Sequence, residues 1–275
     1  MMPDEMIPFV SNDAAGYEVF MGRWTNRLAG PFLEFAGVGR GQRVLDVGCG
    51  TGVITAAAAD LGASIVGLDP SDAYLDFART QRSRASASFE RGGVHHIGHP
   101  DAAFDAVVST LALDVIPDAE RVAQEMRRVT RSGGTIASAI HDFRGGLAPF
   151  LMFWDIASAL DSRAQAIRDT ILSHPLVWPE GQANMWRAVG LADVVEVPLV
   201  IPFDYTSFAD YWSTFESGQG RIWSYVMELP NERRADLQNH VRVAYLSGMA
   251  DGPRSFSVII RAAKGLVRGA SDSPF

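Results

Sequence analysis

The feature that most constrains this chain is a glycine-rich turn between a short apolar run and an alanine-rich one. Residues 43–47 are mostly apolar, as a buried parallel strand should be, and residues 52–61 read as a helix. The turn between them has the pattern Asp46-x-Gly48-x-Gly50-x-Gly52. Glycine permits positive φ and has no Cβ, so the backbone of this turn can approach a ligand closely.

Alternating strands and helices extend this unit from residue 43 to residue 140. Such alternation predicts βαβ units and a parallel sheet. After residue 140 this alternation stops, and the last two predicted strands, 193–200 and 255–261, are expected to pair antiparallel at one sheet edge. The predicted strands are 43–47, 64–69, 86–90, 104–109, 135–140, 193–200 and 255–261. The predicted helical stretches are 52–61, 72–81, 118–131, 147–171, 179–189 and an aromatic-rich insert at 206–246, and the third of them is expected to end at Ser132-Gly133-Gly134.

These elements divide the chain into five predicted parts. A helical lead-in and cap covers residues 1–36, and the ligand-binding core covers 37–140. A helical cap insertion follows at 141–192, then the late strands at 193–263 with their own helical insertion at 204–254. A flexible tail is expected at 264–275.

Composition argues against several classes of partner. The formal net charge is −8 and the sequence has no block rich in Lys and Arg, which argues against nucleic acid. No apolar stretch approaches the roughly 20 residues that cross a bilayer, so no membrane partner is expected. The single cysteine, Cys49, and the absence of a signal peptide pattern favour a cytoplasmic protein. A homodimer is left open.

Two acids indicate what the turn binds. Asp46 and Asp69 end neighbouring predicted strands, and ligands of open α/β sheets bind beyond those strand ends. Asp69 can accept hydrogen bonds from both hydroxyls of a ribose, whereas an acid at Asp46 would repel a pyrophosphate. The pair therefore favours a nucleoside whose far end is cationic, and S-adenosylmethionine meets that description.

Four segments resemble the class I S-adenosylmethionine-dependent methyltransferases. The branch that this chain resembles is the methyltransferase type 11 branch of ubiquinone and menaquinone biosynthesis. The resemblance implies an α/β fold with a Rossmann-like sheet of seven strands, an antiparallel last strand, helices on both faces and a helical cap. The segments are Val44-Leu45-Asp46-Val47-Gly48-Cys49-Gly50-Thr51-Gly52, Gly67-Leu68-Asp69-Pro70-Ser71, Phe104-Asp105-Ala106-Val107-Val108-Ser109 and Met126 to Gly134.

The resemblance also implies roles for individual residues. The turn (Asp46, Gly48, Cys49, Gly50, Thr51 and Gly52) and the segment from Ser109 to Leu111 would surround the methionine part of the cofactor. Asp69 would hold the ribose, and Pro70 would contact the adenine. Relatives carry an acid for the adenine amino group where this chain has Gly93, which leaves backbone atoms near Val94. We expect a cofactor affinity weaker by about 1–2 kcal/mol for one lost charge-assisted bond.

For each of the other candidate residues, a purely structural role is an alternative to the functional one. His141, after the fifth strand, is a candidate general base, and the alternative is an ordinary loop histidine. Tyr17 and Arg23 are candidates for closing over the cofactor, although Arg23 would serve equally in a surface salt bridge. The predicted substrate-lining residues, which would otherwise be cap core or a turn cap, are Trp24, Asp114, Phe143 and Trp154. No metal site is predicted, because His95, His96 and His99 lack a further ligand.

The expected function is transfer of a methyl group to a small apolar or aromatic acceptor. Three alternatives remain open at this point. The first is a non-catalytic protein that kept the fold, and the second is a nicotinamide-dependent oxidoreductase, which the acid at Asp46 disfavours. The third is a protein methyltransferase, which would need an open groove in place of a covered pocket.

Overall fold

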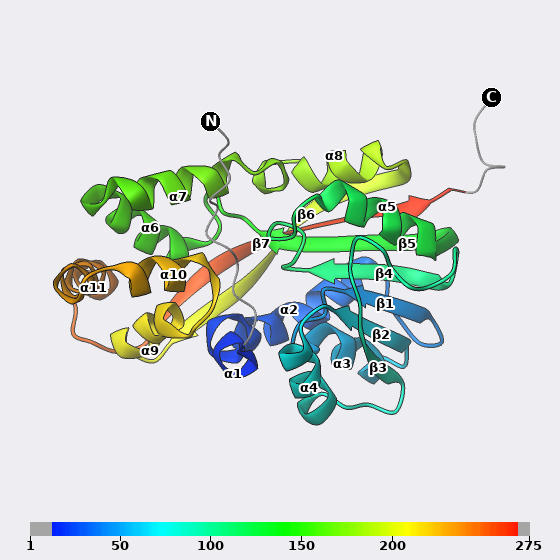
Figure 1. Ribbon diagram of the computed structural model, residues 1–275, viewed down its shortest axis with the longest axis horizontal. Helices are drawn as coiled ribbons and strands as arrows, with labels where there is room; N and C mark the ends of the chain where they lie inside the picture. Colours follow the sequence, from blue (N-terminus) through cyan, green and yellow to red (C-terminus); the bar gives the residue numbers. More distant parts are fainter. Residues whose placement is uncertain (1–12, 269–275) are drawn as a thin grey trace.

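The computed structural model describes residues 13–268 and is built on one seven-stranded sheet (Figure 1). The strand order is β3-β2-β1-β4-β5-β7-β6; β7 pairs antiparallel with both β5 and β6, and the other pairs are parallel. This confirms the predicted fold class. The strands are β1 (Arg43–Val47), β2 (Ser64–Asp69), β3 (Ala87–Arg91), β4 (Phe104–Thr110), β5 (Thr130–His141), β6 (Leu191–Tyr205) and β7 (Arg254–Val267).

Helices cover both faces of the sheet because successive strand residues point to opposite sides. On one face, Val44 of β1 lies in the same buried cluster as α2 (Arg23–Ala36) and α3 (Val53–Asp60). On the other face, Leu45 packs in a cluster with α5 (Ala119–Val129) and α8 (Gly181–Ala188). The helix α4 (Asp72–Gln81) contacts β3, and its cap is Ser71, whose hydroxyl accepts from the Tyr74 amide at 3.4 Å.

The segment Ser132-Gly133-Gly134 does not end a helix, as the sequence suggested, but lies within β5. The helix α5 already ends at Val129, because Thr130 is extended and pairs with Phe104 of β4. The register between the two strands then shifts, and Gly133 takes a φ of +73°. The glycines therefore form a bulge, which uses the same conformational freedom that a helix terminus would.

A helical cap stands beyond the strand ends and has an aromatic core. The stretch expected to be helical around residues 147–171 divides at Asp161, whose backbone is extended and whose side chain caps the next helix by accepting from the Arg163 amide at 2.9 Å. Buried rings such as Phe153, Tyr211 and Phe215 pack together in the cap. Its elements are α6 (Ala148–Leu160), α7 (Ser162–Ser173), η2 (Pro175–Val177), α9 (Phe208–Ser213), η3 (Thr214–Glu216), α10 (Gly220–Glu228) and α11 (Asn231–Leu246).

The two late strands are longer than predicted and extend past the rest of the sheet. Pairing of β7 with β5 ends at Ile260, whereas its pairing with β6 continues to Arg254 opposite Tyr205. Residues 199–205 and 254–260 thus form a two-stranded ribbon that reaches the cap helices (Figure 1). At its other end β7 continues to Val267, so residues 264–267 belong to the sheet and not to a flexible tail.

The N-terminal part of the described chain begins with α1 (Ala14–Tyr17) and η1 (Glu18–Gly22), which lead directly into α2. Residues 1–12 and 269–275, where the sequence suggests loose ends, lie outside the described residues. Between residues 13 and 268, no helix combines the length and the apolarity that a bilayer crossing requires.

Candidate active site

Two adjoining cavities open beyond the carboxyl ends of the parallel strands. The first has a volume of about 380 Å³ and is bordered by the turn after β1, the end of β2 and the loops after β3 and β4. The second, of about 70 Å³, lies between the sheet and the cap. Tyr17, Leu111 and Val115 line both cavities. The two spaces therefore share a wall, where a group bound in one can meet a group bound in the other.

The glycine turn forms the floor of the first cavity. Gly48 and Gly50 have φ values of +72° and +53°, a region that side chains disfavour. The amides of Gly48 and Cys49 donate to the carbonyl of Leu68 at 2.8 and 3.1 Å, which ties the turn to β2. A Cβ at Gly48 would lie 2.9 Å from the Cβ of Ala112, so the turn leaves no room for a side chain there.

Asp69 connects the turn to the cavity. One carboxylate oxygen accepts from the Gly50 amide at 2.9 Å, and the other accepts from the Ser71 amide at 2.9 Å. The side chain is 7% exposed, and burial raises its pKa. Each carboxylate oxygen has a second lone pair, so the group can still accept two hydroxyl donors. A ribose diol fits this carboxylate, and the bare glycine backbone fits the adjoining amino-acid part of S-adenosylmethionine.

Asp46 does not line the cavity, in contrast to the role that the resemblance implies. It is fully buried behind the turn, where one carboxylate oxygen accepts from the Thr55 hydroxyl at 2.7 Å. Burial raises the pKa of Asp46 to about 7. Asp46 faces α3 because it points to the opposite side of β1 from its neighbours Leu45 and Val47. The buried Thr55 partner was missed, since a threonine in an alanine-rich helix gives no distinct signal.

The remaining predicted cofactor residues divide into two groups. Those on the cavity wall are Tyr17, Gly48, Gly50, Asp69, Pro70, Gly93, Val94 and Leu111. Those not on the wall are Cys49, Thr51, Gly52, Ser109 and Arg23. The Ser109 hydroxyl, for example, donates to the carbonyl of Val47 at 2.8 Å and so ties β4 to β1. The wall also includes Thr110, which belongs to the predicted segment from Ser109 to Leu111, and Tyr74 and Ile116, which the sequence motifs do not single out.

Arg23 lies away from both cavities, so the geometry supports its salt-bridge alternative. Its guanidinium donates to Asp210 at 2.6 Å and to the Thr214 hydroxyl at 3.1 Å, and it lies 4.3 Å from the ring of Trp24. Trp24, expected to line the substrate pocket, instead stacks on Phe203 of the ribbon with ring centroids 4.5 Å apart. Both side chains fix the lead-in to the ribbon and the cap.

The loop after β3 closes the far end of the first cavity. Gly93 is exposed, and a Cβ there would meet nothing within 4 Å. His95, expected in a solvated loop, is exposed but also lines the cavity, and its Nε2 lies 2.6 Å from the carbonyl of Pro117. His99 pairs with Glu90 at 3.1 Å. Within residues 13–268 no group of three or more His, Cys, Asp or Glu side chains is placed to hold a metal.

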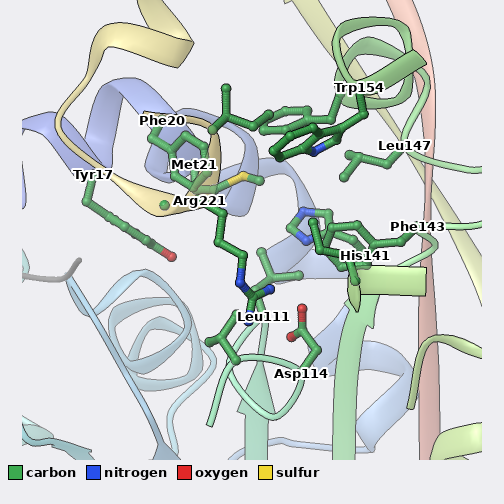
Figure 2. Close-up of a pocket in the computed structure, with 15 residues that line it drawn as sticks. Tyr17, Phe20, Met21, Leu111, Asp114, His141, Phe143, Leu147, Trp154 and Arg221 are labelled. Atoms are coloured by element: carbon green, nitrogen blue, oxygen red, sulfur yellow. The ribbon is translucent and has the colours of Figure 1, made fainter. Parts of the chain in front are cut away.

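The second cavity has mostly apolar and aromatic walls (Figure 2). Phe143 and Trp154, both predicted to line the substrate pocket, lie on this wall. Phe20 and Phe150 also lie on it, and the centroids of their rings are 5.7 Å apart. Elements from four parts of the chain meet here, because η1 supplies Phe20, the turn after β4 supplies Leu111, the end of β5 leads to Phe143 and the cap supplies Phe150 and Trp154. Such walls suit a small ligand with an apolar body.

Three polar side chains interrupt the apolar wall. His141 and Asp114 are 5% and 7% exposed, and Arg221 from α10 lies on the same wall (Figure 2). Burial lowers the pKa of His141 to about 3, so its imidazole is neutral near pH 7. Burial raises the pKa of Asp114 to about 6, although the positive charge of Arg221 acts in the opposite direction. Arg221 was not predicted, since nothing in the sequence distinguishes it from the other cap arginines.

Comparisons with known proteins agree with this arrangement. A family model described as a methyltransferase domain matches residues 45–138. Uncharacterised proteins of Mycobacterium tuberculosis and Mycobacterium bovis are 36% identical over 110 residues, a match that spans 39% of this chain and only 40% of theirs. A demethylmenaquinone methyltransferase of Renibacterium salmoninarum is 33% identical over 207 residues, covering 70% of this chain and 86% of that protein.

A solved structure shares the fold. The phosphoethanolamine N-methyltransferase 2 of Haemonchus contortus, determined with S-adenosylhomocysteine and phosphomonomethylethanolamine, aligns with a TM-score of 0.58, and the alignment covers 93% of this chain and 57% of that one. Its identity of 17% shows the fold alone. The match to the Renibacterium protein extends over most of that protein's length, and the chain therefore belongs to the class I S-adenosylmethionine-dependent methyltransferases.

Proposed function

We propose that this protein transfers the methyl group of S-adenosylmethionine, bound in the first cavity, to a small acceptor bound in the second. The observation that carries the proposal is the common wall of Tyr17, Leu111 and Val115. S-adenosylmethionine supplies an activated methyl electrophile, so the main task of the protein is to align it with the acceptor. A volume of about 380 Å³ lies in the usual range for small-ligand sites, roughly 300–1,000 Å³.

Different residues of the first cavity would contact different parts of the cofactor. Asp69 would accept from the ribose hydroxyls, Pro70 and Val94 would contact the adenine, and the turn at Gly48 would hold the amino-acid part. Leu111 would then lie beside the reactive end. Its φ is +55°, a strained conformation for leucine that its amide supports by donating to the Ala139 carbonyl at 2.7 Å.

The acceptor we propose has an apolar or aromatic body. Its pocket is covered by the cap and lined by rings, whereas a protein substrate would need an open groove. His141 would orient the acceptor by hydrogen bonding. It is poorly suited to take a proton, because a pKa of about 3 lies far below the working pH that an effective base should match.

Calorimetry with S-adenosylmethionine and S-adenosylhomocysteine tests the cofactor part. We expect Asp69→Asn to weaken binding of both by about tenfold or more, because charge-assisted bonds to the ribose are lost. Asp72→Asn is the matched control, since Asp72 is an exposed neighbour outside the cavity and should leave affinity unchanged. Absence of binding to the unmodified protein would overturn the proposal.

Turnover tests the transfer itself. The protein would be incubated with S-adenosylmethionine carrying an isotopically labelled methyl group and with a panel of small aromatic acceptors, followed by mass spectrometry. We expect labelled product together with S-adenosylhomocysteine, and we expect Asp69→Asn to reduce both. Cofactor binding without transfer to any small acceptor would favour the non-catalytic alternative.

A further inference from the structure

The second cavity contains a facing pair of opposite charges within its apolar wall. Asp114 lies in the turn after β4, on the sheet side, and Arg221 reaches towards it from α10 on the cap side (Figure 2). Each shifts the pKa of the other in the direction that favours its charged form. They also share a smaller adjoining cavity of about 10 Å³. The pair therefore spans the junction between the core and the cap.

Two buried atoms in this wall indicate that a protic group binds there. Within residues 13–268, neither Oδ1 of Asp114 nor Nε2 of His141 has a hydrogen-bond partner. A buried polar group without a partner costs about 1–3 kcal/mol, so such atoms call for an explanation. A bound acceptor that donates a hydrogen bond would satisfy the carboxylate.

The charges of the pair restrict the acceptor further. A permanent ammonium group would be attracted by Asp114 but repelled by Arg221, and a permanent carboxylate would be attracted by Arg221 but repelled by Asp114, so the pair favours neither. A neutral group that becomes anionic during the reaction matches both partners, because the carboxylate can take its proton while the guanidinium stabilises the resulting anion. A phenol or an enol on an apolar body has these properties.

We propose that the acceptor bears a weakly acidic hydroxyl, that Asp114 is the base that removes its proton, and that Arg221 stabilises the oxyanion. This inference rests on the proposed function and assigns its substrate class. The O–H bond breaks as the proton moves to Oδ1 of Asp114. The acceptor oxygen then forms a bond to the methyl carbon while the sulfur–methyl bond breaks, which leaves a neutral thioether. Asp114 afterwards releases the proton to water.

The titratable groups around Asp114 are compatible with this role. A pKa near 6 keeps the carboxylate mostly ionised at neutral pH while leaving it close to protonation. His141 at the end of β5 is neutral in this range, and burial together with the positive charge of Arg221 lowers the pKa of His174, which caps η2. Tyr17 from α1 remains a neutral phenol, because burial raises its pKa.

Proton uptake on binding of 4-nitrophenolate provides the test. The dye would be titrated into protein saturated with S-adenosylhomocysteine, at about pH 8, in two buffers that differ in heat of ionisation. We expect uptake of about one proton per dye bound, because two adjacent anions cannot both stay ionised in a buried site. Asp114→Asn should abolish this uptake. Arg221→Gln should weaken dye binding by about tenfold, the loss of a charge-assisted hydrogen bond.

Asp169→Asn is the matched control, because it removes an exposed carboxylate of α7 outside both cavities and should change neither uptake nor affinity. Retained binding of S-adenosylhomocysteine shows that each variant is folded. Dye binding without proton uptake in the unmodified protein would overturn the inference. So would failure of the dye to bind while S-adenosylhomocysteine still binds, and this result would leave the proposed function intact. Failure of S-adenosylhomocysteine to bind would overturn the proposed function itself.

Discussion

At the scale of single residues, Asp46 and Asp69 show how similar sequence positions acquire different tasks. Both end parallel strands next to the glycine turn. Asp69 accepts from two backbone amides and lines the first cavity, whereas Asp46 is enclosed and pairs with Thr55. Asp46 therefore affects the cofactor only through the position of the turn, and its effect on stability is the more direct one.

The raised pKa of Asp46 predicts a pH-dependent cost to stability. Its pKa is about 7 in the folded protein against 3.8 ordinarily, so between these values the folded state holds more protons and stability falls as pH rises. We expect the melting temperature of the unmodified protein to fall more between about pH 5 and pH 8 than that of Asp46→Asn. Scanning calorimetry at both pH values measures this, and parallel pH profiles would contradict it.

The missing adenine acid at Gly93 predicts that affinity can be increased. Because a side chain at Gly93 meets nothing within 4 Å, Gly93→Asp should be accommodated without a clash. We expect it to tighten binding of S-adenosylhomocysteine by about fivefold to thirtyfold, as one added charge-assisted bond allows. Calorimetry measures the gain. Gly98→Asp, equally open and in the same loop but off the cavity wall, should show none.

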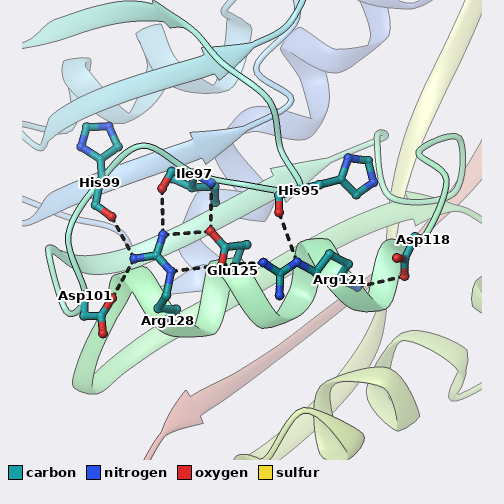
Figure 3. Close-up of polar contacts among 8 residues, drawn as sticks. All are labelled: His95, Ile97, His99, Asp101, Asp118, Arg121, Glu125 and Arg128. Carbon is teal, nitrogen blue, oxygen red and sulfur yellow. Dashed lines mark hydrogen bonds and ion pairs between the residues drawn. The ribbon is translucent and has the colours of Figure 1, made fainter.

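At the scale of elements, the loop between β3 and β4 depends on α5 for its shape (Figure 3). Glu125 accepts from the Ile97 amide at 2.9 Å and from two nitrogens of Arg128 at 2.8 and 3.0 Å. Arg128 also donates to the carbonyls of Ile97 and His99 and to Asp101. This network holds the loop whose other end carries Gly93 and Val94 to the cofactor cavity.

Glu125→Gln should loosen that loop. Hydrogen bonding to Arg128 lowers the pKa of Glu125 to about 2, so its contribution is present above the ordinary value of 4.5 and is lost as pH falls towards 2. We expect a loss of about 1–3 kcal/mol in the free energy of unfolding near pH 7 and weaker binding of S-adenosylhomocysteine. Urea unfolding should show the deficit shrink near pH 3. Glu120→Gln, exposed on the same helix, should lack both effects.

The elements and the cofactor cavity were largely predictable, because local patterns determine them. Apolar runs, glycine spacing and strand-end acids place the sheet and Asp69 without tertiary information. The bulge at Gly133 was misread because a glycine pair serves helix ends and bulges alike. The acceptor site could be predicted only in part from the sequence. Arg221 comes from a cap helix whose position depends on tertiary packing. Arg23 forms an ion pair with Asp210, which is distant in sequence, and local patterns do not reveal such a partner.

At the scale of the whole molecule, the cap is fastened to the core at several places. The Tyr74 hydroxyl of α4 donates to the Gln219 side chain at 2.8 Å, and the Gln219 amide donates to the carbonyl of Asp13 at 3.0 Å. The ring of Tyr17 lies 5.1 Å from that of Tyr74. Gln219 therefore joins the beginning of α10 to both the lead-in and the cofactor domain.

Removal of this junction should expose the bound cofactor. We expect Gln219→Ala to increase the dissociation rate of S-adenosylhomocysteine and the hydrogen exchange of α1 and η1, because a fully buried amide loses two partners. Stopped-flow dissociation and exchange measured by mass spectrometry report the two effects. Gln165→Ala, on an exposed face of α7, serves as the comparison. Equal rates in both variants would show that the lead-in is held by other contacts.

The ribbon of β6 and β7 joins the sheet directly to the cap. Both strands pass from the sheet to the cap, and their pairing is unbroken from Val195 to Tyr205 of β6, so rotation of the cap relative to the sheet would bend this paired backbone. We therefore expect ligands to enter by displacement of the short helices α1 and η1, which supply Tyr17, Phe20 and Met21 to the cavity wall. Chemical cross-linking of these two helices to α4 should then trap a ligand that is already bound.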